Sequence, residues 1–328
     1  MTATGPGGAS VHDPLPPGRP GEVEAAAAPL DSSRPPLYDP PRRLVPSPGR
    51  DRPWRRGIVL AGSAVMALAV LVLAAATTAT WWNSRLFGDV PATTVLGTPS
   101  SLQLTSSLGD VRVQSSDEVD QVTLSLVAPG TTVPATADET ARALVERSGG
   151  SSSASVRVSQ PESFSTWPGT DDSRDVLLLV PSGHELDLDL RSDVGDVVAE
   201  GVFGSLRVQA DVGDVHLGPV AATEEVSVTA DVGSIEAEIA APGPAAVDLS
   251  SSIGDVALQL PADAGGTVGA VTELGDVRIA VAGTSTWEVE SRSAYGEVTV
   301  DPDLHGTQGE AAGTLTAVTE TGDVTLTR

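Results

Sequence analysis

The 328-residue sequence contains no cysteine and no lysine, and aromatic residues make up only 3% of it. Without cysteine the chain can form no disulfide and offers no thiolate ligand to a metal. All 19 basic residues are therefore arginine, set against 44 acidic residues. With so few aromatic side chains, a folded domain of this chain must build its core from aliphatic residues.

The net charge of −25 is unevenly distributed along the chain. Residues 1–56 hold eight Arg and six acids (8 − 6 = +2), whereas residues 80–328 hold eleven Arg and 38 acids (11 − 38 = −27). Nucleic-acid binding needs a basic surface that neutralises phosphates. An acidic C-terminal part therefore argues against nucleic acid as a partner.

Residues 1–56 form a tail rich in Pro, Gly and Ala, with 13 of the 25 prolines. Such a composition buries too little apolar surface to offset chain entropy, so we expect a disordered cytoplasmic tail. Pro17-Gly-Arg-Pro20 and Pro35-Pro36-Leu37-Tyr38 have the form of ligands for aromatic grooves. Chance matches in a low-complexity tail are the alternative.

Residues 57–80 form an uncharged run of 24 residues, longer than the ~20 that a helix needs to cross a bilayer. Arg50, Arg52, Arg55 and Arg56 precede the run, and only Arg85 follows it closely. This asymmetry predicts a single-pass cell-membrane protein with a cytoplasmic N-terminus and an extracellular C-terminal domain. The alternative is a signal peptide that is cleaved after small residues near 74–76.

Residues 81–100 then form a connector, and a motif of the form Gly-Asp-Val repeats through the remainder. Its glycines are Gly109, Gly195, Gly213, Gly233, Gly254, Gly275, Gly296 and Gly322. From Gly195 onward they lie 18, 20, 21, 21, 21 and 26 residues apart. A period near twenty indicates a stacked repeat architecture. Stacked repeats make extended surfaces more often than enclosed active sites.

Between the glycines, aliphatic and polar residues alternate with the period of a β-strand. Two all-β architectures fit this pattern: an antiparallel sheet with hairpin tips at Gly-Asp, or a β-solenoid whose coils are about 20 residues long. The aliphatic interior favours the solenoid over 101–328, with Val228, Val256, Leu258 and Val277 pointing inward. Stacking Asp196 on Asp214 would bring like charges together, which counts against it.

One helix is expected in this part of the chain. Thr136 and Glu139 form a capping box before Ala137–Arg147. The helix would cover the open end of the solenoid or pack on its side. The last strand, Asp323–Arg328, has no helix after it, which makes it the expected place for self-association.

The run Leu177–Gly218 resembles the bacterial putative-adhesin family of β-strand repeat proteins, a domain of unknown function. The resemblance rests on an apolar strand, the turn Pro181-Ser-Gly183, iterated Gly-Asp-Val coils and the step Gly204-Ser205. It extends over roughly residues 100–328. It implies a surface-located β-solenoid and no catalytic residue.

No residue stands out as catalytic, cofactor-binding or metal-ligating. Gly-Asp turns could hold Ca²⁺, but the nine-residue calcium repeat is absent and a turn-forming role suffices. Asp171, Asp172 and Asp175 form an acidic cluster that we expect to be solvated. The four histidines are scattered at His12, His184, His216 and His305.

The leading interpretation is a membrane-anchored, non-enzymatic surface module that adheres to, or interacts with, an extracellular or cell-wall partner. A second interpretation is a component that senses envelope stress and signals through the tail. A third is a polysaccharide-active enzyme, which would need a groove with clustered carboxylates and a basic residue. Arg207 and Arg278 are the main candidates for that basic residue.

Overall fold

A computed structural model describes residues 52–84, 87–136, 138–161, 173–305 and 311–328. The tail with its two proline motifs, His12, Asp171 and Asp172 lie outside the described residues. Among these residues are one α-helix, twenty strands and a short 3-10 helix, Pro302–Leu304.

The helix α1 (Arg52–Ser84) contains the apolar run expected from the sequence. Its segment Gly57–Ala74 has a mean hydropathy of 2.5, and none of that segment is buried in the protein. By length and composition the helix can cross a membrane, a property that signal sequences share.

The strands occupy most of the chain from Gly88 onward. The N-terminal strands are β1 (Gly88–Pro91), β2 (Thr93–Gly97), β3 (Ser101–Ser106), β4 (Val111–Ser116), β5 (Val122–Val127), β6 (Thr140–Gly149), β7 (Ser153–Ser159), β8 (Asp175–Pro181) and β9 (Asp187–Val194). The following strands are β10 (Val197–Val212), β11 (Val215–Val232), β12 (Ile235–Ile239), β13 (Ala246–Ile253), β14 (Val256–Leu260), β15 (Gly266–Leu274), β16 (Val277–Val281), β17 (Glu288–Tyr295), β18 (Val298–Val300), β19 (Gly313–Thr321) and β20 (Val324–Thr327).

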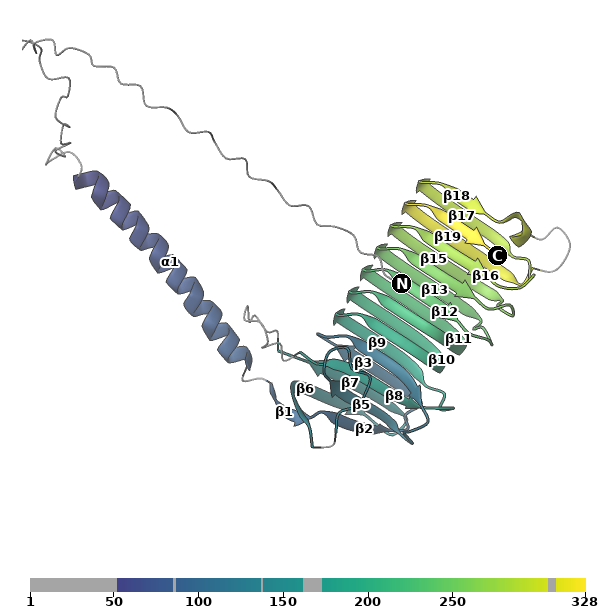
Figure 1. Cartoon of the computed structure of the whole chain (residues 1–328), viewed down its shortest axis with the longest axis horizontal. Coiled ribbons are helices and arrows are strands. Elements are labelled where there is room, and N and C mark those ends of the chain that lie inside the picture. The colour runs from purple at the N-terminus through teal and green to yellow at the C-terminus, as the bar shows by residue number, and fades with distance from the viewer. Residues whose placement is uncertain (1–51, 85–86, 137, 162–172, 306–310) are drawn as a thin grey trace, which may run out of the picture. The chain divides into compact units, whose positions relative to one another are not determined.

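All of these strands except β1, β2, β5 and β6 stack in parallel as coils of a β-solenoid with two facing layers (Figure 1). The first layer runs β7, β3, β9, β10, β11, β13, β15, β19, β17. The second layer runs β8, β4, β10, β11, β12, β14, β16, β20, β18. The long strands β10 and β11 bend midway, so each contributes its first half to the second layer and its second half to the first layer. The all-β class and the parallel repeat expected from the sequence are therefore present.

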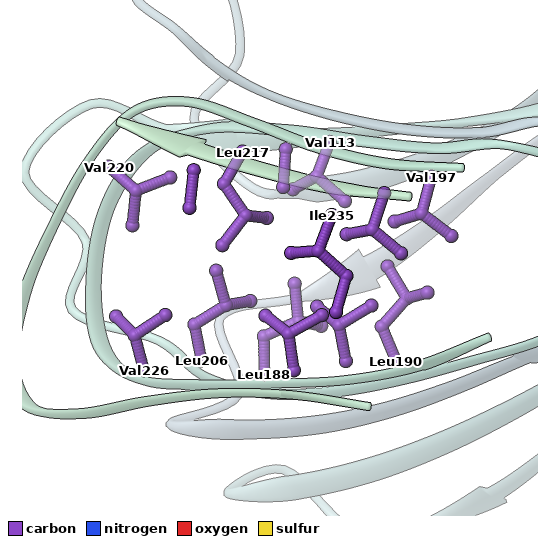
Figure 2. Close-up of a cluster of buried hydrophobic side chains, with 14 of the residues drawn as sticks. Val113, Leu188, Leu190, Val197, Leu206, Leu217, Val220, Val226 and Ile235 are labelled. Atoms are coloured by element: carbon purple, nitrogen blue, oxygen red, sulfur yellow. The ribbon is translucent and has the colours of Figure 1, made fainter. Parts of the chain in front are cut away.

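A thin aliphatic core fills the space between the layers. In Figure 2, Val197 and Leu217 of the second layer face Leu188 and Leu206 of the first. Equivalent positions stack in register, as in the pairing of Val197 with Val215. The four predicted inward residues are confirmed, since each is at most 1% exposed: Val228, Val256, Leu258 and Val277. Aliphatic side chains make up nearly all of this interior, and Phe203 and Trp287 are the aromatic residues buried in it among the described residues.

The N-terminal end of the stack is covered by antiparallel strands rather than by a helix. β6 pairs with β7, and β5 pairs with β8, each in the antiparallel sense. The chain over 88–97, within the segment predicted as a connector, then crosses this end, since β1 pairs with β6 and β2 with β5. The prediction of a helix over 137–147 is wrong, because Thr140–Gly149 is strand β6.

The last coil in the sequence is not the last coil in space. β19 lies between β15 and β17, and β20 lies between β16 and β18. The expectation that Asp323–Arg328 forms an uncovered end suited to self-association rests on a wrong premise, because β20 is paired along both edges. The strands at the C-terminal end of the stack are β17 and β18.

Candidate functional site

The Gly-Asp turns line up along one edge of the solenoid, where each coil passes from the first layer to the second. Gly213 and Gly254 have φ angles of 142° and 149°, a region that side-chain-bearing residues rarely adopt. A Cβ at Gly254 would also overlap the carbonyl oxygen of Gly233 in the preceding coil. The turn therefore requires glycine both for its backbone conformation and for the close approach of adjacent coils.

The aspartates of these turns form a ladder between coils. The backbone N–H of Asp214 donates to Oδ1 of Asp196 at 2.9 Å, and the N–H of Asp276 donates to Oδ1 of Asp255 at 2.9 Å. Where Ser234 replaces aspartate, its Oγ accepts from the N–H of Asp255 at 3.3 Å. The sequence predicts a turn-forming role for each aspartate, and in the structure its carboxylate accepts an N–H of the neighbouring coil.

This ladder reduces the cost of stacking like charges. An aspartate that accepts an N–H gains a charge-assisted hydrogen bond, which offsets part of the repulsion from the next carboxylate. Arg278 adds a cation between two coils, at 3.6 Å from Oδ2 of Asp255 and 2.6 Å from Oδ2 of Asp276. The charge repulsion that counted against a solenoid is therefore partly compensated.

Asp110 stands at the N-terminal part of the ladder in a less favourable environment. Burial raises the pKa of its carboxyl group above the usual 3.8, and the nearby carboxylates of Asp175 and Asp196 raise it further. The N–H of Asp196 and the charge of Arg112 act in the opposite direction. Asp175 is itself buried, and it accepts from Asp110 N–H at 3.2 Å and Gly130 N–H at 2.7 Å. The expectation that Asp175 is solvated is therefore wrong.

An exposed aliphatic residue precedes the glycine of each central turn, and together these residues form what we call the apolar stripe. They are 45–51% exposed and stack in register from coil to coil. The stripe consists of Val194, Val212, Val232, Ile253 and Leu274. Thr321 and then Tyr295 continue the line toward the C-terminal end.

Carboxylates border the apolar stripe on both sides. On one side are the turn aspartates Asp196, Asp214, Asp255 and Asp276; on the other are Asp193, Asp211, Asp231 and Glu273. We call these two groups the acidic rows. Ser234 and Ser252 interrupt them, and Arg278 is the cation that contacts them. The edge is thus a line of aliphatic side chains between two lines of negative charge.

A shallow polar depression of about 280 Å³ lies on the first layer near the N-terminal end. Four strands line it, with Ser101, Ser155, Asp187, Asp189 and Arg207 among its residues. Its charged groups already have partners: Arg207 contacts Glu225 at 3.0 Å, and Asp187 Oδ1 accepts from the hydroxyl of Ser205 at 3.1 Å. The depression has the residue types that the enzyme interpretation requires, but not an unpaired catalytic pair.

The three histidines that the structure describes do not come together. His184 contacts the carbonyl oxygen of Pro99 at 2.7 Å, and His216 lies 3.5 Å from Glu236. His305 lies beside Trp287 through a backbone bridge. Across the described ranges, no three His, Asp or Glu residues are grouped so that they could hold a metal ion.

Comparison with known proteins gives only distant similarities. The chain matches no protein-family profile. It also matches no curated protein. A putative cell adhesion protein from Clostridium sporogenes ATCC 15579 is 8% identical with a TM-score of 0.32, and the match covers 73% of this chain and 99% of that one. A putative adhesin from Bacteroides fragilis NCTC 9343 is 10% identical with a TM-score of 0.41, and the match covers 73% of this chain and 97% of that one.

Proposed function

We propose that this protein is a non-enzymatic interaction module, held in the cell membrane by α1, whose apolar stripe and acidic rows bind an extracellular partner. The observation that carries the proposal is the exposure of five aliphatic side chains in one unbroken line. Scattered exposed aliphatic residues need no explanation, whereas a contiguous row bordered by charge is typical of a binding surface.

The chemistry of this edge favours a cationic, amphipathic partner. The aliphatic residues repeat at the strand spacing of about 4.8 Å, so the five span about 19 Å. A helix with one apolar residue per turn repeats every 5.4 Å and spans about 22 Å in four turns. Such a helix can lay its apolar face on the stripe while its Lys and Arg side chains reach the acidic rows.

The same charges disfavour other occupants. An anionic lipid surface or a nucleic acid would bring phosphates against the acidic rows. A second copy of this edge would bring carboxylates against carboxylates. A partner with positive charge on both sides of an apolar line therefore complements the edge best.

The proposed topology rests on the arginine cluster before the apolar run and on the length of α1. In intact cells, protease should cleave the β domain and leave the tail protected. A soluble mature protein that begins near residue 81 would instead identify a cleaved signal peptide. If deletion of residues 2–50 abolished the cellular phenotype, the signalling alternative would gain support.

Binding can be tested with the full-length protein in nanodiscs and a fluorescent helical peptide of Lys and Leu as the probe. The double variant Val232→Ser with Ile253→Ser should weaken binding at least about tenfold, because each fully buried aliphatic side chain contributes roughly 1.5–3 kcal/mol. Val202→Ser is the matched control, since Val202 is 54% exposed but lies outside the stripe. Equal binding by both variants would exclude the stripe as the docking surface.

The polar depression supports a second candidate function, which is action on a polysaccharide. Its hydroxyl, carboxylate and guanidinium groups suit the hydroxyls of a sugar. If the protein hydrolyses glycans, purified protein should release reducing ends, and Asp187→Asn or Asp189→Asn should abolish the release. Absence of any release from cell-wall glycans would leave the interaction function as the better account.

A further inference from the structure

The two ends of the solenoid are finished differently. At the N-terminal end, antiparallel strands complete both layers. At the C-terminal end, β17 pairs only with β19, and β18 pairs only with β20, among the described residues. The backbone groups along the outer edge of β17 therefore face outward over eight residues, a template to which another strand can add.

The core is also open at the C-terminal end. Val289 and Val300 continue the inward columns of the two layers, yet both are only half-buried, and Val298 is 40% exposed. The equivalent residues one coil further in, Leu315 and Leu326, are fully buried. A strand added to this end would cover apolar atoms as well as backbone groups.

The outward side chains of β17 include charged residues that face no opposite charge on the neighbouring strand β19. Glu288, Glu290 and Arg292 stand beside Thr314, Thr316 and Val318 of β19. All three charged residues are exposed, and no ion pair involves Glu290 or Arg292 within the described ranges. Residue 290 is negative and residue 292 is positive, so these two charges complement those of an antiparallel β17 from a second copy.

We propose that β17 binds β17 of a second copy in the antiparallel sense, with Ser291 at the two-fold axis. Residues directly opposite each other must share a face, which requires their numbers to have an even sum. Centring on Ser291 places Glu290 opposite Arg292 of the second copy, and the reverse. Centring on Glu290 or Arg292 would place that residue opposite itself, and centring on Val289 would place Glu288 opposite Glu290.

This contact differs from the stripe and goes beyond it. A two-fold, isologous contact closes on itself, so it produces dimers rather than fibres. It also places the two N-terminal ends at opposite ends of the pair. If the domain is displayed from the membrane as proposed above, two such copies on facing membranes would link them, and the protein would adhere to itself.

The test uses full-length protein in detergent micelles, with association measured by analytical ultracentrifugation. Wild type should dimerise. Glu290→Arg and Arg292→Glu, each alone, should weaken dimerisation about tenfold or more, since each replaces two opposite-charge pairs with two like-charge pairs. The combined variant Glu290→Arg with Arg292→Glu should dimerise as wild type does. A mixture of the two single variants should form the mixed dimer.

Controls separate pairing from folding. Glu238→Arg makes the same charge change at an exposed position in the middle of the stack, and it should dimerise normally. At concentrations low enough to keep every protein monomeric, thermal melts of the variants should match wild type, because the exchanged side chains are exposed. A monomeric wild type, or single variants that dimerise normally, would overturn the proposal. Stronger association of the variant Glu290→Thr with Arg292→Thr than of wild type would also overturn it. The charges would then prevent strand pairing at this edge instead of promoting it.

Vesicle clustering then tests the adhesion step separately. Vesicles bearing wild-type protein should cluster, those with either single variant should not, and mixing the two single-variant populations should restore clustering. Dimers in detergent without clustering of vesicles would preserve the β17 contact and contradict the proposed display of the domain. If vesicles bearing either single variant clustered as much as wild-type vesicles, the β17 contact would be contradicted.

Discussion

The two long edges of the solenoid contrast in regularity. At the Gly-Asp edge the same short turn recurs, and its backbone, carboxylates and aliphatic side chains stay in line from coil to coil. At the opposite edge the connections differ: β10 and β11 bend without interruption, whereas β12 and β13 are joined by a loop with a cis Ala241–Pro242 bond. Coils of different length therefore differ at the opposite edge, while the Gly-Asp edge keeps a constant geometry that suits a linear partner.

The largest effect should come from a charge placed in the core between the edges. Val256 is fully buried and stacks between Ile235 and Val277. Val256→Asp would bury a carboxylate without a partner and should destabilise the fold by more than about 4 kcal/mol, measured by chemical denaturation. Asp255→Asn, one residue away and exposed, should be tolerated. Similar tolerance at both positions would contradict the assignment of faces.

Adding one methyl group at each edge tests the contrast more directly. Gly254→Ala should cost about 2 kcal/mol or more, because φ is 149° and the Cβ would overlap Gly233 O. Gly218→Ala lies at a register shift in β11 shortly before its bend, where the nearest atoms to a Cβ are 3.6 Å away. It should change stability by less than about 0.5 kcal/mol. Equal losses in thermal melts would remove the proposed difference between the edges.

Removing one rung of the aspartate ladder should have a smaller effect. Asp214 Oδ1 accepts from the N–H of Ser234 at 2.8 Å. Asp214→Ala should cost about 1 kcal/mol, the contribution of a typical hydrogen bond. Asp214→Asn retains an acceptor at the same place and should lose less. If Asn and Ala lowered the melting temperature equally, the hydrogen bond would not be the source of stability.

The smallest expected effect is a pH-dependent gain in stability from replacing Asp110. The pKa of Asp110 is raised in the fold, so protonated Asp110 favours the folded state. This contribution to the free energy of unfolding is complete below the unfolded pKa near 3.8 and is lost as pH rises through the folded pKa. At pH 7 Asp110→Asn should raise the melting temperature, because it removes a carboxylate whose charged form is disfavoured first by burial and then by repulsion from Asp175 and Asp196. The gain should shrink toward pH 3, where wild type is protonated.

A control for this pH dependence is Asp276→Asn, which removes the contact with Arg278 at 2.6 Å. It should give no gain at pH 7. An increase in melting temperature from Asp110→Asn that was the same at pH 3 and pH 7 would show that the ionised carboxylate is not its cause.

Much of the fold follows from patterns that the sequence states directly. Alternation at Val256 and Leu258 identifies the inward face, and glycine at a fixed place in every repeat identifies the turn. The apolar stripe does not follow from the same reasoning. Val212 lies in phase with the buried Val208 and Ala210, so the alternation would place it inward, yet at the turn it is 48% exposed.

Other features depend on contacts between distant segments. In residues 140–149, both helical and strand periods place apolar residues on one face, since Ala141 and Val145 satisfy either. This segment forms a strand because it pairs with the free edge of β7. Glu139 contacts Arg174 at 3.1 Å instead of capping a helix. The insertion of β19 between β15 and β17 likewise leaves no local mark, because every coil carries the same motif.

Protection of single introduced cysteines tests the central claim, that the Gly-Asp edge is the binding surface. Because the chain has no native cysteine, Ile253→Cys and Val202→Cys each give a unique thiol on the full-length protein. The rate of maleimide labelling would be measured with and without a saturating amphipathic peptide of Lys and Leu. The account predicts slower labelling at position 253 and an unchanged rate at position 202. Equal rates at position 253 with and without bound peptide would contradict it.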